Sequence, residues 1–143
     1  SRGLGDVYKR QVSGNGMFTH PCPGYSRISS YFGYREQPLA GASTNHKGMD
    51  FAAPQGTPIY AAAAGTVTSS GYSGKAGKRI VINHGNGLVT IYMHCHTLYV
   101  SAGTKVSKGQ NIAAVGTTGN STGNHLHFQV NLNGTPVNPL KYL

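Results

Sequence analysis

The chain has 143 residues and a formal net charge of +9, because twelve basic residues face only three acidic ones. This length fits one compact domain, and three carboxylates, Asp6, Glu36 and Asp50, leave little for a paired-carboxylate mechanism of the glycosidase type. The charge favours an anionic polymer as partner, but no nucleic-acid partner is expected, because no helix-turn-helix, zinc-finger or aromatic RNA-binding pattern accompanies it.

Residues 1–16 are polar, Gly-rich and without periodicity, so we expect a flexible leader or a non-native remnant there and a single domain over 17–143. Beyond Phe18, short β-branched and aromatic runs alternate with Gly, Pro and Asn turns, a pattern that predicts strands. The predicted strands are 28–34, 57–60, 65–68, 79–83, 88–94, 111–115 and 126–132. No amphipathic segment of helical length, membrane span or signal-peptide core occurs in this sequence. A mostly β fold follows.

Two Asn-Gly pairs, Asn86-Gly87 and Asn133-Gly134, border predicted strands. Asn-Gly readily adopts the positive dihedral angles of a tight hairpin, so these pairs predict an antiparallel sheet. Residues 56–59 and 103–106 echo each other as Gly-Thr followed by a short apolar run, which indicates two similar β units.

The two cysteines, Cys22 and Cys95, lie far apart and show no metal-binding spacing. We expect them to form one disulfide, which would contribute roughly 4 kcal/mol in the loop-entropy model and imply an oxidising compartment. The alternative is two separate buried thiols.

Histidine supplies most of the available chemistry. On an extended strand, His125 and His127 share one face while Leu126 and Phe128 occupy the other. His46 and Asp50 are separated by an even number of residues, so a short extended or turn segment can aim both at one point. Two nitrogens and a carboxylate oxygen are then available to zinc.

A catalytic zinc site uses three protein ligands and one open position that holds water. His46, Asp50 and one histidine of the His125/His127 pair meet this need. No zincin HExxH helix occurs, so the base is expected to be His94 or the other histidine of the pair. Single HxH or HxxxD motifs are common without metal, and His94 alone would also suit a hydrogen-bonded core position.

Five blocks in this order resemble the lysostaphin/LytM-type zinc metallopeptidases, which cut peptide cross-links of bacterial peptidoglycan. The blocks cover most of the chain from Phe18 onward. They are HKGMDFAAP with GTP (46–58), HGNG (84–87), YMH (92–94), VSKGQ (106–110) and GTTGNSTGNHLHF (116–128).

The resemblance implies that His46, Asp50 and His127 bind one Zn²⁺ per chain, while His94 and His125 hold and deprotonate the attacking water. It implies an antiparallel β-sheet groove with loop walls, of the duplicated hybrid-motif or barrel-sandwich-like kind. The expected walls are 36–45, 69–78, 96–101 and 116–124.

The substrate groove is expected to include Tyr92, His96 and Asn124, with Asn124 standing where many relatives have proline. Tyr92 and His96 share the expected strand face of His94, where they would otherwise be ordinary surface residues. His84 is expected to be structural or exposed, and His20 has no predicted partner.

By this resemblance the protein is expected to act as a monomer on peptidoglycan peptides, outside the cell or in the cell wall, where anionic wall polymers suit its charge. A lipoyl or biotinyl carrier domain shares the VSKGQ phrase, but no modifiable lysine in an acidic hairpin setting is present. A second alternative is a catalytically silent wall-binding or scaffold module of the same fold.

Overall fold

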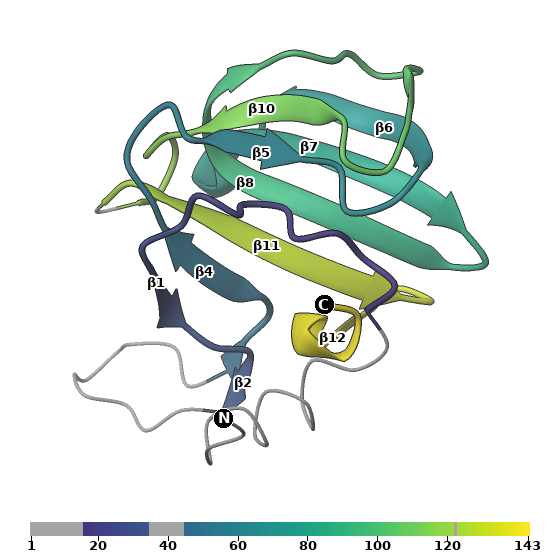
Figure 1. Ribbon diagram of the computed structural model, residues 1–143, viewed down its shortest axis with the longest axis horizontal. Coiled ribbons are helices and arrows are strands. Elements are labelled where there is room, and N and C mark those ends of the chain that lie inside the picture. The colour runs from purple at the N-terminus through teal and green to yellow at the C-terminus, as the bar shows by residue number, and fades with distance from the viewer. Residues whose placement is uncertain (1–15, 35–44, 122) are drawn as a thin grey trace.

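The computed structural model describes residues 16–34, 45–121 and 123–143 (Figure 1). The strands are β1 (Arg27–Ser30), β2 (Gly33–Tyr34), β3 (Asn45–His46), β4 (Met49–Ala52), β5 (Pro58–Tyr60), β6 (Gly65–Tyr72), β7 (Lys78–Gly85), β8 (Leu88–Leu98), β9 (Lys105–Val106), β10 (Asn111–Val115), β11 (His125–Leu132) and β12 (Thr135–Val137). Helix in these ranges is limited to two 3₁₀ turns, η1 (Gly74–Ala76) and η2 (Pro139–Lys141), and none of it could cross a membrane. The predicted mostly β fold is confirmed.

All strand pairs of the described residues are antiparallel, and one large sheet runs in the order β1-β4-β11-β8-β7-β6-β9. The long strands β8 and β11 lie side by side through its middle (Figure 1), and β8 also pairs with β10, which carries β5. β2 and β3 form a separate two-stranded sheet. The main sheet is not closed into a barrel, so one face of β4, β11 and β8 is left for a site.

Six of the seven predicted strands occur, several of them longer than predicted, but the strand predicted over 28–34 is wrong in part: residues 31–32 break it into β1 and β2, which belong to different sheets. The wall predicted over 69–78 is wrong in part, because β6 runs to Tyr72 and only 73–77 turn; likewise β8 continues to Leu98. The expected wall 36–45 lies almost entirely outside the described residues, as does the leader apart from Gly16. The 116–124 segment is a loop, joined to β11 by a bridge between Gly116 and His125.

Both Asn-Gly hairpins are confirmed. Asn86 has φ 55° and Gly87 φ 80° between β7 and β8, while Asn133 has φ 54° and Gly134 φ 84° between β11 and β12. Two successive positive φ angles match the right-handed twist of the flanking strands.

The predicted internal echo has the same hydrogen bonding in both copies. Each Gly-Thr pair exchanges two main-chain bonds of 2.7–2.9 Å with a single valine: Gly56 and Thr57 with Val115, Gly103 and Thr104 with Val67. Both glycines have positive φ, 92° and 94°. The two Gly-Thr segments therefore share the same local main-chain pairing, while the presence of two similar β units stays a prediction.

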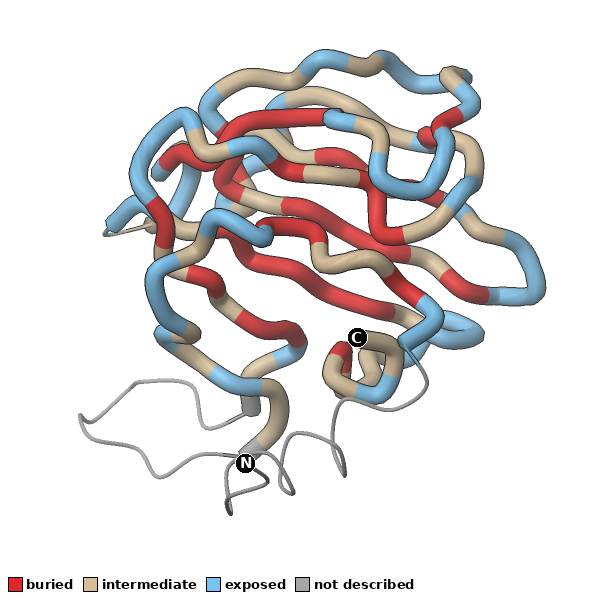
Figure 2. Tube along the Cα trace, viewed as in Figure 1, coloured by how far each residue is buried: buried red, intermediate tan, exposed pale blue. Residues whose placement is uncertain are grey.

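The core lies on the face of β11 that carries Leu126, Phe128 and Val130, each 0% exposed. Figure 2 shows this buried band along β11 and β8. Burial of one such side chain contributes roughly 2 kcal/mol. Alternation along β11 therefore fixes which face remains for His125 and His127, as the sequence predicts.

The predicted disulfide is not formed. Cys22, before β1, and Cys95, in β8, are both free and fully buried. Cys95 Sγ donates to the Tyr92 carbonyl oxygen at 3.7 Å, and the Cys22 amide donates to His20 Nδ1 at 3.0 Å. Each cysteine is packed as a small apolar residue, which is the alternative that the sequence left open.

Candidate metal centre and active site

Neighbouring strands place the acidic residue against the HxH pair. His127 of β11 lies opposite Asp50 of β4 on one side and opposite Met93 of β8 on the other. Residues directly opposite each other in an antiparallel sheet project from the same face. Asp50, His127 and Met93 therefore share the face that the core does not use.

His46 reaches the same point from β3, across a bend at Lys47 and Gly48. Its Nε2 lies 3.4 Å from Asp50 Oδ2. The bend passes very close to β11: a Cβ on Gly48 would lie 2.5 Å from the Phe128 carbonyl oxygen and 2.9 Å from the ring atom Nε2 of His127. Glycine is required there because any side chain would enter the His127 ring.

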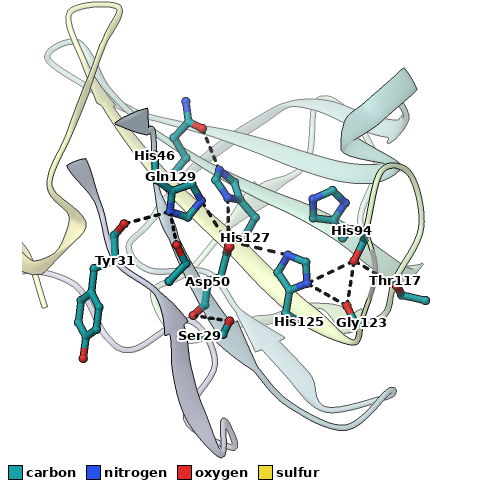
Figure 3. Close-up of polar contacts among 12 residues, drawn as sticks. Ser29, Tyr31, His46, Asp50, His94, Thr117, Gly123, His125, His127 and Gln129 are labelled. Atoms are coloured by element: carbon teal, nitrogen blue, oxygen red, sulfur yellow. Dashed lines mark hydrogen bonds and ion pairs between the residues drawn. The ribbon is translucent and has the colours of Figure 1, made fainter. Parts of the chain in front are cut away.

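Three side chains, His46, Asp50 and His127, offer ligand atoms that all lie within 4.8 Å of one another, and this is the metal-capable group found among the described residues. Tetrahedral zinc with bonds of about 2.1 Å places its ligand atoms about 3.4 Å apart. The pairs measure 3.4 Å for His46 to Asp50 and 2.9 Å for His127 Nδ1 to Asp50 Oδ1 (Figure 3). Two imidazoles and a carboxylate at this spacing fit zinc.

Asp50 is held as a carboxylate. Its burial would raise the pKa, but hydrogen bonds and positive charge from His127 and His46, when these rings are protonated, outweigh burial and hold the pKa of Asp50 below its ordinary value. His125 Nε2 lies 3.8 Å from the same carboxylate. An anionic oxygen is therefore ready for a cation.

His94 enters this face through a β-bulge. It has φ 67°, in the left-handed region, and the register of β8 shifts beside it against both β7 and β10. The shift brings its ring to 4.9 Å from that of His125 and 6.4 Å from that of His127, measured between centroids. A non-glycine residue at positive φ is uncommon, and outside tight turns such residues cluster at functional sites.

The bulge also corrects the expectation for Tyr92. Regular alternation would put Tyr92 on the face of His94, but Tyr92 is 0% exposed and its hydroxyl is bonded to the Ala62 amide and to Thr90. Burial raises its pKa to about 12. Tyr92 is a core residue and not part of the groove.

Main-chain carbonyls orient three of the four site histidines. A carbonyl only accepts, so Nδ1 of each carries the proton and Nε2 keeps its lone pair. The Nδ1 partners are Tyr31 at 3.1 Å for His46, Thr118 at 2.8 Å for His94 and Gly123 at 2.9 Å for His125. Burial, with the nearby His125 and His127, lowers the pKa of His94 despite the Thr118 bond. A neutral His94 can accept a proton.

Two clefts flank the cluster. One, of about 310 Å³, is lined by Lys75, Ala76, Met93, His94, Asn120 and His127. The other, of about 250 Å³, is lined by Phe32, Gly33, His46, Lys47 and Pro136. Of the other groove predictions, His96 and Asn124 are exposed, but neither lines these clefts.

Three residues that line the cleft or contact a site histidine were not predicted from the sequence: Lys75, Asn120 and Gln129. Lys75 and Asn120 come from separate turns, joined by the bond from the Asn120 amide to the Lys75 carbonyl at 2.8 Å. Gln129 was also missed, although its position two residues after His127 on β11 places it on the same face. His84 is structural, as expected, because it bonds the Ala64 carbonyl and Thr90, and burial lowers its pKa.

The chain is similar to several known proteins. The profile of peptidase family M23 matches residues 44–139. The DD-carboxypeptidase/endopeptidase Mpg of Neisseria gonorrhoeae is 47% identical over 81% of this chain, and the peptidoglycan DD-endopeptidase ShyA of Vibrio cholerae is 42% identical over 85%. The chain spans 27% and 29% of these relatives.

Solved structures of peptidases have a similar fold. A zinc-containing peptidase from Vibrio cholerae aligns with a TM-score of 0.81 at 36% identity, covering 90% of this chain and 40% of that one. The catalytic domain of lysostaphin from Staphylococcus simulans aligns at 0.73 and 31% identity, covering 82% and 91%. The resemblance drawn from the sequence motifs is confirmed: the chain belongs to peptidase family M23.

Proposed function

We propose that this chain is a zinc-dependent endopeptidase that hydrolyses cross-link or stem peptides of bacterial peptidoglycan. One Zn²⁺ per chain would be held by His46 Nε2, Asp50 and His127 Nδ1. The observation that carries the proposal is the convergence of these three ligand atoms beside two further imidazoles, His94 and His125, whose Nδ1 atoms are bonded to main-chain carbonyls. The names of the M23 relatives supply the substrate class.

Bound zinc would supply a Lewis acid that lowers the pKa of a water molecule and polarises the scissile carbonyl. His94 and His125 would orient that water and take its proton at Nε2, because their Nδ1 protons are committed to carbonyls of the 116–123 loop. The same histidines would then return the proton to the leaving amine. No side-chain nucleophile is needed.

The charge of the clefts supports an anionic peptide substrate. Lys75 lines one cleft and Lys47 the other, while Asp50 is the sole carboxylate side chain in the described ranges. Peptidoglycan stem peptides carry free carboxylates, which such a field attracts. A monomer acting outside the cytoplasm, in the periplasm or cell wall, fits this substrate and its anionic polymers.

The first experiment uses purified peptidoglycans of several cross-link types, with zinc-loaded and chelator-stripped protein in parallel. Mass spectrometry of the soluble fragments should find new amine termini only with zinc, and their position names the bond. Bound zinc without release from any wall would favour the silent wall-binding or scaffold module.

Variants separate the ligands from the base. His46→Ala and Asp50→Ala should lose zinc and activity together, whereas His94→Ala should keep zinc and lose about 10²–10⁴-fold in kcat. His96→Ala, an exposed histidine two residues along β8, is the matched control. A full zinc equivalent in Asp50→Ala would overturn the ligand assignment, and an equal loss in His96→Ala would move the base away from His94.

A further inference from the structure

His127 is oriented differently from the other site histidines. His46, His94 and His125 donate Nδ1–H to main-chain carbonyls, which no substitution can remove. The hydroxyls of Ser30 and Ser121 add side-chain contacts to Nδ1 of His46 and His125, at 3.0 and 3.3 Å. His127 instead turns Nδ1 toward Asp50 Oδ1, at 2.9 Å, and places Nε2 3.0 Å from Oε1 of Gln129 (Figure 3). Its orientation therefore depends on a side chain.

The amide of Gln129 is itself held in one orientation. Its Nε2 donates to Asn131 Oδ1 at 3.1 Å, so Oε1 is the end that faces His127. His127, Gln129 and Asn131 occupy alternate positions of β11 and therefore project from one face. The three side chains form a row that ends at the metal centre.

His127 and Gln129 are both buried, so water cannot easily replace the hydrogen bond between them. His127 is 9% exposed and Gln129 8%, so solvent has little access to replace a lost partner. An imidazole N–H that is buried without an acceptor pays its full desolvation penalty. The ring would then be free to turn toward another acceptor, and Nδ1 would leave the point shared with His46 and Asp50.

We propose that Gln129 is a positioning residue of the metal centre: Oε1 accepts the Nε2 proton of His127 and so directs the Nδ1 lone pair at the zinc, while Asn131 holds the Gln129 amide in register. The proposal rests on the zinc site proposed above. It adds a residue that touches neither metal nor substrate and acts through His127 alone.

The test measures zinc affinity by competition with a chromophoric chelator, which needs no substrate. Gln129→Leu keeps the size but removes the acceptor, and should weaken zinc binding roughly 10–100-fold, the range for lost partners of metal-bound histidines. Gln129→Glu restores an acceptor and should bind zinc at least as tightly as the parent. Gln110→Leu is the matched control, because it removes an amide acceptor, from the Ser107 N–H at 3.0 Å, in the turn between β9 and β10. It should leave zinc affinity unchanged.

The outcomes are distinct. A parent that binds no zinc overturns the proposed function and this proposal together. Tight zinc binding by the parent with Gln129→Leu within threefold of it overturns the role of Gln129 alone. An equal loss in Gln110→Leu does the same, since general destabilisation would then account for the effect.

A second measurement needs no variant and covers the case in which Gln129→Leu fails to fold. Long-range ¹H–¹⁵N NMR spectra of the zinc-bound parent should show the His127 proton on Nε2 and the protons of His46, His94 and His125 on Nδ1. A His127 proton on Nδ1 would overturn the proposal.

Discussion

The carbonyl oxygen of Thr118 accepts a hydrogen bond from His94 Nδ1 at 2.8 Å, across 24 residues of sequence. Thr118 is fixed in turn by its hydroxyl, which donates to the Cys95 carbonyl at 2.7 Å and accepts from the Lys78 amide at 3.0 Å. The loop that aims His94 is thus anchored to β8, the strand that carries it.

Thr118→Val should therefore lower kcat on the order of tenfold, because both anchoring bonds disappear while the carbonyl remains, and small displacements of a base are costly. Zinc content should stay at one equivalent. Thr68→Val, at an exposed position of β6 outside the site, is the control for steady-state kinetics. Equal kcat in the two variants would contradict an anchoring role for Thr118.

Gly48→Ala should weaken zinc binding at least tenfold and destabilise the protein by about 1–3 kcal/mol, because the new methyl group would enter the Phe128 carbonyl and the His127 ring. Gly123→Ala is the control within the same site, since a Cβ there meets nothing within 4 Å. Zinc titration and thermal melts check both. Parental zinc affinity in Gly48→Ala would show that the bend can move away from β11.

Lys75→Ala should raise KM up to about fivefold for a peptide with a free carboxylate near the scissile bond, the size expected of an exposed ion pair. The effect should vanish for the amidated peptide and shrink at high salt. Lys105 lies on β9 at the far edge of the sheet, so Lys105→Ala is the control and should leave KM unchanged for both peptides. A uniform rise in KM for both peptides would assign Lys75 to general binding instead of carboxylate recognition.

The two cysteines should titrate as two free thiols in the denatured, unreduced protein. In the native protein they should react slowly, because burial raises the pKa of Cys22 to about 11 and that of Cys95 to about 12, leaving little thiolate. A thiol reagent with and without denaturant makes the measurement. Finding no thiol before reduction would restore the disulfide predicted from the sequence.

Stability should fall as the pH drops from 6.5 to 4, partly through His20. Burial against Tyr25 and Phe51 lowers the pKa of His20 from 6.5 to about 4, so the unfolded chain takes up the proton first in this window. This loss of unfolding free energy is absent above pH 6.5 and reaches on the order of 2–3 kcal/mol at pH 4.

His20→Phe keeps a ring at this position but cannot titrate, so its unfolding free energy should depend less steeply on pH between 4 and 6.5. It should also be less stable throughout, because the Cys22 amide loses its acceptor. Chelator in both samples removes the contribution of metal. Parallel curves for the two proteins would show that His20 does not titrate in this window.

Local patterns of the sequence predicted much of the fold. Asn86-Gly87 and Asn133-Gly134 mark hairpins because their backbone preferences act within two residues. Alternation along 126–132 separates the core face from the histidine face because side chains of a strand project to opposite sides. The sequence does not predict β4 as a strand, because four residues are too few to show an alternating pattern. The HKGMD motif (46–50), which overlaps the start of β4, nevertheless predicts the site.

The sequence by itself determined the class of fold, the family and the set of residues available for chemistry, since residue type, short-range spacing and turn preference are written in local order. Only the tertiary structure decided that Tyr92 is buried, that the bulge turns His94 toward His125, that the cysteines stay apart and that the Gln129 amide lies 3.0 Å from His127 Nε2. Each of these depends on the register between strands and on contacts between distant segments, which packing of the whole sheet sets and no local pattern encodes.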